Sequence, residues 1–278
     1  MNEKNRDGKR AARERLQQER ELQKAREKRR RLLIVSAAVV GVLGLAAVVG
    51  VIAANTGGGG GGKDSDAAGG PVVAPSGAEG EKSLALPAGA SDAPSTLTIW
   101  EDFRCPACAQ FENGFRETIH ELTDSGQLKV EYHLATIIDG NMGGSGSLRA
   151  ANAAACAQDA GKFVPYHDVL YQNQPAEVDD AFAKNSKLIE LAGKVEGLDT
   201  PAFRKCVEDG THDSWVDKSA EAFRAGDFSG TPTVLLNGEP VFPQKGNEQI
   251  SPANLKKWVE EANKDKKPGT EQPSPAAS

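Results

Sequence analysis

The 278-residue sequence predicts an α/β domain that follows one membrane-spanning helix. Three observations carry this prediction. A basic arm at the N-terminus leads into a long apolar run without charges. Strand-like and helix-like hydrophobic periods then succeed one another in an ordered way. Two cysteines stand three residues apart, at the point where the first predicted strand gives way to the first predicted helix.

The arm and the apolar run predict an uncleaved membrane anchor. Residues 1–31 hold 13 Lys and Arg against 6 Asp and Glu, whereas the remainder holds 20 against 33. Leu32–Ala54 are 23 residues without a charge. A helix of that length spans about 34 Å, enough to cross the apolar core of a bilayer. The positive-inside rule then places the arm in the cytoplasm and residues 55–278 outside it. The alternative is a cleaved signal peptide, whose apolar region is usually shorter, about 7–15 residues.

The basic arm does not predict a nucleic-acid partner. Its acidic residues are interleaved with the basic ones, as in Arg13-Glu14-Arg15, which suits a solvated helix with local ion pairs. We therefore interpret its charge as a topology signal.

The segments on either side of the folded domain have the composition of flexible chain. Residues 55–83 are rich in Gly, Ala, Ser and Asp and predict a tether with a reach of roughly 30 Å. Residues 264–278 are rich in Lys, Pro and Ser and predict a disordered tail. The folded domain is then expected over residues 84–263.

The first half of this domain reads as strand, helix, strand and a long helical region. Thr96–Phe103 alternates and contains β-formers, so it predicts a strand. Pro106–Thr123 has helical spacing, and Leu128–Ile138 predicts a second strand. Ser147–Ala225 is helical in several pieces, one of which begins at Thr200 and Pro201 with an N-cap hydroxyl and an N1 proline.

The second half predicts a hairpin and a final helix. Thr233–Leu236 and Pro240–Phe242 are expected to pair around a tight turn at Asn237 and Gly238. Ser251-Pro252 then opens the last helix. The predicted order is β-α-β, a helical insertion, and β-β-α.

Cys105 and Cys108 form the predicted redox-active centre. Disulfide exchange needs one thiol that ionises easily and a second within reach to resolve a mixed disulfide. A helix that starts at Cys105 exposes that sulfur to unpaired N–H groups and to the positive end of the helix dipole. Cys108 lies nearly one turn further on and can close the bridge. Pro106 fits the first helical position, where its missing N–H costs nothing.

The competing interpretation of the CxxC motif is half of a zinc site. A tetrahedral site needs two further ligands, but Cys156 and Cys206 are far apart and the four histidines form no closely spaced pair. A CxxC between a strand and a helix is typical of a thioredoxin-like redox motif. We therefore predict a thioredoxin-like fold with a helical insertion at about residues 147–225, and expect neither metal nor cofactor.

The domain resembles the DsbA-like thiol–disulfide oxidoreductases of the bacterial cell envelope. The resemblance rests on residues 101–108 (EDFRCPAC), on the helical insertion and on residues 229–233 (SGTPT), and it covers about residues 84–263. It implies that Pro232 follows a cis peptide bond and packs against the redox pair. It also implies that Thr231 and Pro232 border the surface that binds an extended substrate peptide.

Two departures from the family pattern qualify the site. Strongly oxidising relatives have histidine where this chain has Ala107, so Ala107 beside Pro106 should leave the pKa of Cys105 higher than theirs. Many relatives also carry a buried acid where this chain has Ile99. Glu101 or Asp102 is a candidate for proton transfer with Cys108 instead, and the alternative is a solvated carboxylate at the end of a strand.

Cys156 and Cys206 both lie in the predicted helical insertion. They are open to two interpretations: buried thiols used as small apolar groups, or a structural disulfide. An oxidising compartment favours the bridge, and related proteins with a large helical insert carry one.

The sequence thus predicts an extracytoplasmic oxidase that exchanges disulfides with cysteine-containing exported proteins through Cys105 and Cys108. The resemblance implies reoxidation by a quinone-coupled membrane partner. Two alternatives remain open: a reductase or isomerase of envelope proteins, and a carrier that holds copper or zinc on the CxxC thiolates. Only Met1 and Met142 add further thioethers, which disfavours the carrier.

Overall fold

The computed structural model describes residues 71–176, 178–226 and 228–271. The predicted basic arm, the predicted anchor, most of the tether and the end of the tail lie outside these residues. Among the helices of the described ranges, none combines the length and the apolar character needed to cross a membrane.

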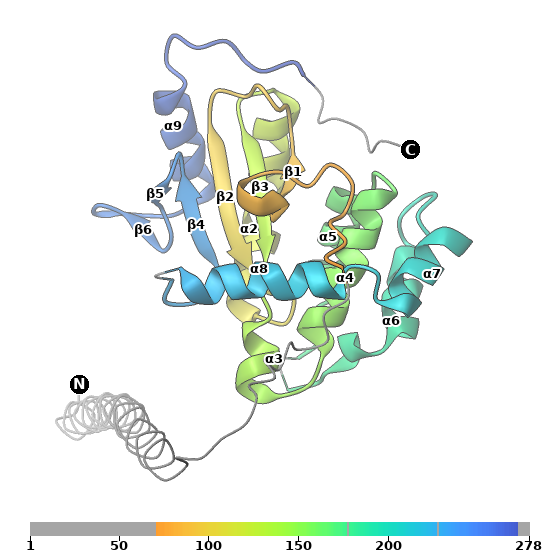
Figure 1. Ribbon diagram of the computed structural model, residues 1–278. Helices are drawn as coiled ribbons and strands as arrows, with labels where there is room; N and C mark the ends of the chain where they lie inside the picture. Colours follow the sequence, from red (N-terminus) through yellow and green to blue (C-terminus); the bar gives the residue numbers. More distant parts are fainter. Residues whose placement is uncertain (1–70, 177, 227, 272–278) are drawn as a thin grey trace, which may run out of the picture. The chain divides into compact units, whose positions relative to one another are not determined.

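A five-stranded sheet with the order β1-β3-β2-β4-β5 forms the centre of the domain (Figure 1). β2 (Thr96–Glu101) and β3 (Lys129–Leu134) run parallel, as the predicted β-α-β order requires. β4 (Thr233–Leu236) runs antiparallel to β2 and places Thr233 opposite Trp100. This register brings the residues before β4 to the end of β2, where the chain continues to the cysteines.

The outer strands of the sheet are short. β5 (Glu239–Pro240) pairs with β4 through a turn in which Asn237 and Gly238 have φ angles of 52° and 85°, as a tight hairpin turn requires. The predicted hairpin is confirmed, although its second strand begins and ends earlier than Pro240–Phe242. β1 (Leu86–Ala88) pairs antiparallel with β3 and was not predicted.

Helices cover both faces of the sheet. Figure 1 shows α8 (Asp213–Ala225) crossing one face, with α2 (Pro106–Asp124) and α9 (Pro252–Ala262) on the other. The predicted helical face of α2 is confirmed, and it buries these side chains: Cys108, Phe111, Glu112, Phe115, Ile119 and Leu122. The Ser251 side chain caps α9 by accepting the N–H of Asn254, as its position before a proline predicts.

The part of the helical insertion that precedes α8 lies beside the sheet and consists of separate short elements. They are α4 (Gly146–Asp159), α5 (Phe163–Gln172), the 3₁₀ turn η2 (Ala181–Ala183), α6 (Asn185–Ala192) and α7 (Pro201–Asp209). The predicted cap of α7 is present, because the Thr200 hydroxyl accepts the N–H of Phe203 at 3.2 Å. The remaining short elements are η1 (Glu81–Ser83), β6 (Gln244–Lys245) and β7 (Glu248–Gln249).

The predicted strand over Leu128–Ile138 is too long. The strand ends at Leu134, and the chain then turns into the helix α3 (Ile137–Met142). The Asp102 carboxylate accepts the N–H of Ile138 at 2.9 Å, so a buried side chain from β2's end holds the start of this helix. Local periodicity could not reveal that partner.

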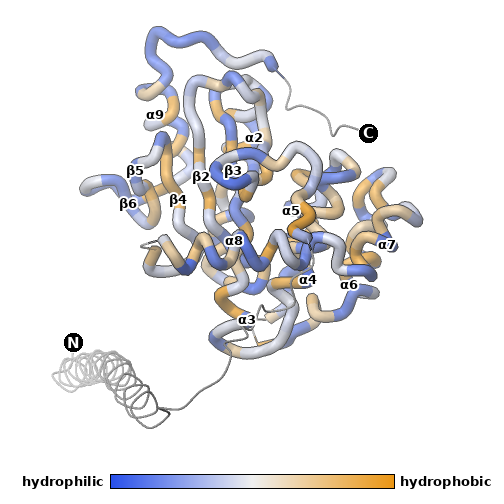
Figure 2. Tube along the Cα trace, viewed as in Figure 1, coloured by the Kyte–Doolittle hydropathy of each residue, from blue (hydrophilic) through white to orange (hydrophobic). Residues whose placement is uncertain are grey.

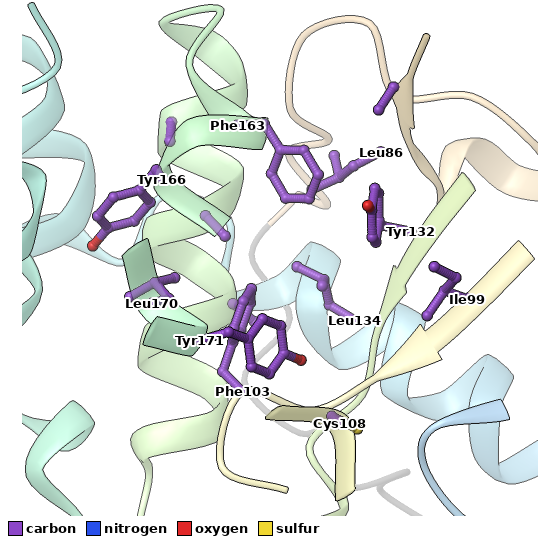
Figure 3. Packing of buried hydrophobic residues seen from close by; sticks show 14 of the residues in the cluster. Leu86, Ile99, Phe103, Cys108, Tyr132, Leu134, Phe163, Tyr166, Leu170 and Tyr171 are labelled. Atoms are coloured by element: carbon purple, nitrogen blue, oxygen red, sulfur yellow. The ribbon is translucent and has the colours of Figure 1, made fainter. Parts of the chain in front are cut away.

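Apolar residues gather in the sheet and on the inner faces of the helices, whereas the segment after α9 is hydrophilic (Figure 2). Figure 3 shows where this core meets the redox pair: Phe103 and Tyr171 pack together just above Cys108. The side chain of Cys108 therefore belongs to the core of the domain, and is fully buried.

Candidate functional site

The CxxC motif stands at the start of α2, as predicted. Cys105 is the N-cap residue of the helix and Pro106 occupies its first position. The N–H of Cys105 donates to the Asp102 carbonyl at 2.9 Å, and the Gln174 side chain donates to the Cys105 carbonyl at 3.0 Å. These bonds fix the turn between β2 and α2. Ala107 is exposed at the surface between the two cysteines.

The surroundings of the two sulfurs lower the pKa of Cys105 and raise the pKa of Cys108. Hydrogen bonds from the Cys108 thiol, the Thr231 side chain and the N–H groups of Cys108 and Ala107 lower the pKa of Cys105 from 9.0 to about 6, although burial acts against them. Burial, together with the bond and the charge of Cys105, raises the pKa of Cys108 well above 9.0. The reduced pair thus holds a thiolate at Cys105 and a proton on Cys108 at neutral pH.

Thr231 and Pro232 lie beside Cys105, where the pairing of β4 with β2 brings them. The peptide bond between them is cis. The Cys105 thiol can donate to the Thr231 carbonyl, whose oxygen lies 3.3 Å from its sulfur. The structure therefore brings Thr231 and Pro232 next to the CxxC motif, although the two stretches are far apart in the sequence.

Glu101 and Asp102 are both fully buried, so the interpretation of either as a solvated carboxylate is wrong. Asp102 accepts the N–H groups of Arg104 and Ile138 at 2.8 and 2.9 Å. Burial raises the pKa of Asp102 from 3.8 to about 6, despite these bonds. Glu101 instead accepts a hydrogen bond from the His167 ring at 2.9 Å.

Glu112 and His167 are two buried ionisable residues near this site that the sequence reasoning missed. Glu112 is 4% exposed and His167 is 1% exposed. A signal for Glu112 was present, because its position falls on the apolar face of the helix between Phe111 and Phe115. The partner of His167 comes from a different element, so no local pattern announces it.

Arg104 braces the site from the side of the insertion. Its guanidinium lies 2.6 Å from Asp139 and 3.2 Å from Asp180, and it donates to the carbonyl of Gly143 at 2.9 Å. The residue immediately before Cys105 therefore contacts both the segment that precedes α4 and the segment that precedes η2. Such a charge-assisted network holds the backbone around the cysteines in one arrangement.

Cys156 and Cys206 form a disulfide that joins α4 to α7. The alternative of two free buried thiols therefore does not apply. His212 lies close to both sulfurs, but bonded sulfurs are not thiolate ligands. Among the described residues, the other group with metal-ligand spacing is Glu101, Glu112 and His167.

Comparisons with known proteins agree with this geometry. Residues 83–261 match the model of a family described as thioredoxin. The probable disulfide bond formation protein D of Bacillus cereus is 25% identical over 158 residues, which cover 56% of this chain and 71% of that protein. The disulfide bond formation protein D of Bacillus subtilis is 25% identical over 156 residues, covering 55% and 68%.

Solved structures show the same likeness. The oxidised DsbA of Mycobacterium tuberculosis is 30% identical, with a TM-score of 0.55, and the match covers 64% of this chain and 92% of that one. The reduced form of the disulfide bond oxidoreductase DsbG from the same organism is 29% identical, with a TM-score of 0.55 and coverages of 64% and 86%.

Proposed function

Because this chain belongs to the thioredoxin family and is a DsbA-like thiol–disulfide oxidoreductase, we propose that it forms disulfide bonds in exported proteins on the outer side of the cell membrane. The observation that carries this proposal is the different placement of the two sulfurs, because Cys105 is the N-cap residue of α2 whereas the side chain of Cys108 is fully buried. A pair in which Cys105 ionises and Cys108 keeps its proton has one reacting sulfur and one resolving sulfur.

The reaction starts from the Cys105–Cys108 disulfide. A substrate thiolate attacks the Cys105 sulfur, the bond between the cysteines breaks, and the Cys108 sulfur leaves with the electron pair and takes up a proton. A second substrate thiolate then attacks the substrate sulfur that is bound to Cys105. The substrate disulfide forms, Cys105 leaves as a thiolate, and two electrons have passed from the substrate to the protein.

The stabilised thiolate favours the oxidase direction. At pH 7 a pKa of about 6 in place of 9.0 stabilises the reduced form by roughly 1.4 kcal/mol, which makes the disulfide about 30 mV more oxidising. A reductase or isomerase would use the same sulfurs with electrons flowing the other way. The redox potential separates the two.

The substrate is proposed to bind along Thr231 and Pro232. An extended peptide that pairs with the backbone at Thr231 would bring its cysteine next to Cys105, because the Thr231 carbonyl lies 3.3 Å from the Cys105 sulfur. A metal carrier is less well supported, because it needs two accessible thiolates and Cys108 is fully buried.

The membrane location and the redox partner are parts of the same proposal. The apolar run Leu32–Ala54 and its basic flank support an anchor with residues 55–278 outside the cytoplasm. A quinone-coupled membrane protein would then remove the two electrons from the reduced pair. Cell fractionation tests the anchor, and a soluble product that begins near Asn55 would contradict it.

The direct test of the function is the equilibrium of Cys105 and Cys108 in a defined glutathione buffer, alongside oxidation of a peptide with two cysteines. The reduction potential of the Cys105–Cys108 pair is compared with those of DsbA, about −120 mV, and thioredoxin, about −270 mV. A value nearer the first, with peptide oxidation, supports the oxidase. A value nearer the second supports the reductase.

A further inference from the structure

Three ionisable side chains meet in the core beneath the redox pair and take no part in the steps above. Glu101 ends β2, Glu112 lies on α2 one turn after Cys108, and His167 lies on α5. None of the three is more than 4% exposed. One nitrogen or oxygen atom of each lies within 4.8 Å of the other two. Cys108 and Glu112 share the buried face of α2, and the charge of Glu101 contributes to the raised pKa of Cys108.

The hydrogen bonds of this cluster indicate that one proton is shared between the carboxyl groups of Glu101 and Glu112. The His167 Nε2–H donates to Glu101 Oε1 at 2.9 Å. Glu101 Oε2 and Glu112 Oε1 are buried and receive no N–H or O–H from the described residues. Buried carboxyl oxygens are rarely left without a partner. A protonated Glu112 that donates to Glu101 satisfies both groups.

Aromatic rings surround the cluster, and its burial among them affects the pKa values of its members. Four aromatic rings lie around His167 at centroid distances of 4.6 Å (Tyr132), 5.0 Å (Tyr171), 5.4 Å (Phe163) and 5.7 Å (Phe103). Burial acts to lower the pKa of His167, but Glu101 and Asp168 raise it to about 10. Burial, followed by the charge of Glu101, raises the pKa of Glu112 well above 4.5. An imidazolium, a carboxylate and a carboxylic acid leave no net charge in the core.

Titratable side chains from the elements packed against the cluster also face it. They are Asp102 after β2, Cys108 and Arg116 on α2, Tyr132 on β3, and Asp168 and Tyr171 on α5. Asp168 lies 3.7 Å from His167 Nδ1, and it is also paired with Arg116 at 3.4 Å and with His120 at 3.3 Å. The proton on Glu112 is therefore controlled mainly by Glu101 and His167.

We propose that Glu112 stores the proton that the Cys108 sulfur takes up, with Glu101 as its hydrogen-bond partner and His167 as the fixed positive charge. This inference rests on the proposed disulfide exchange. When the Cys105–Cys108 bond opens, the Cys108 sulfur leaves with the electron pair and one proton passes from the Glu112 carboxyl group to that sulfur. The negative charge moves from the buried Cys108 sulfur to the Glu101–Glu112 pair of carboxylates, which share the positive charge of His167 until Glu112 is protonated again. Glu112 then regains a proton from solvent. On reoxidation the order is reversed: Glu112 first releases that proton to solvent and then accepts the proton of the Cys108 thiol, so that Cys108 can close the bridge.

The test compares Glu112→Gln with Glu117→Gln, which changes an exposed glutamate on the same helix. A glutamine amide still donates to Glu101 but has no proton to give. Wild type and Glu117→Gln should show the infrared band of a protonated carboxylic acid, altered between the oxidised and reduced protein, and Glu112→Gln should lack it. Reduction of Glu112→Gln by a dithiol peptide at neutral pH should be slower by at least tenfold, as expected when a positioned acid is lost. The pH profile of Cys105 alkylation should stay the same.

Several results would overturn the inference. One is a wild-type spectrum without a protonated carboxylic acid band, which requires no variant to fold. Another is a Glu112→Gln protein whose reduction rate and pH profile match those of Glu117→Gln. A stoichiometric divalent ion that is bound by the wild type and lost in Glu112→Gln would also overturn it, because a metal would displace the proton. If the wild type exchanges no disulfides at all, the proposed function itself fails, and that result is distinct from the others.

Discussion

Replacing Cys156 and Cys206 together by alanine is expected to lower the free energy of unfolding by about 4 kcal/mol, the value that the chain-entropy model gives for this loop. The bridge spans a sequence separation of 50 residues. Typical domains are stable by about 5–15 kcal/mol, so a large part of the total is at stake. With the entropy of unfolding usual for a domain of this size, the same loss lowers Tm by roughly 10 °C.

The assay is urea unfolding of the oxidised wild type and of the double variant, with thiols mapped by mass spectrometry. Cys105 and Cys108 should open in mild reductant while the Cys156–Cys206 bond persists. Exchange activity per folded molecule should be retained, because α4 and α7 carry no residue of the CxxC site. An unfolding midpoint equal to that of wild type would refute the reasoning, as would free thiols at both positions in protein taken from the cell envelope.

Two further predictions concern the redox pair and the residue between its cysteines. Cys108→Ser should accumulate mixed disulfides with substrate proteins, visible on non-reducing gels, because the resolving sulfur is gone, whereas Cys105→Ser should form none; equal trapping by both would argue against the assigned roles. Ala107→His should lower the pKa of Cys105 below its value of about 6 and make the disulfide more oxidising, because a cation beside the thiolate stabilises the reduced form. Thiolate absorbance against pH and a glutathione titration check this, and an unchanged potential would contradict it.

The parts of the fold that local patterns specify were predictable. A proline at the first helical position and apolar residues at helical spacing locate α2 and its buried face. The caps at Thr200 and Ser251 mark α7 and α9 for the same reason. The order of strands and helices follows from these elements, and with the CxxC motif it led to the observed fold.

The features that the sequence did not predict depend on residues that lie far apart in the sequence. The apolar pair Ile137 and Ile138 extends the pattern of β3, but a bond to Asp102 starts a helix there. β1 is a three-residue edge strand with a proline at its centre, too short for an alternating pattern to show. Glu101 was considered as a solvated or proton-transfer carboxylate without its partner His167, because only the fold brings α5 against β2.

The central claim is the division of labour between Cys105 and Cys108, and the pH dependence of alkylation tests it most directly. In the reduced protein, iodoacetamide should modify Cys105 first. Its rate should rise with pH through about 6, the pKa of Cys105, and level off above it, because the thiolate is then fully formed. Cys108 should remain unmodified up to at least pH 9, since burial keeps its proton in place. Faster modification of Cys108, or a midpoint for Cys105 near 9, would contradict the account.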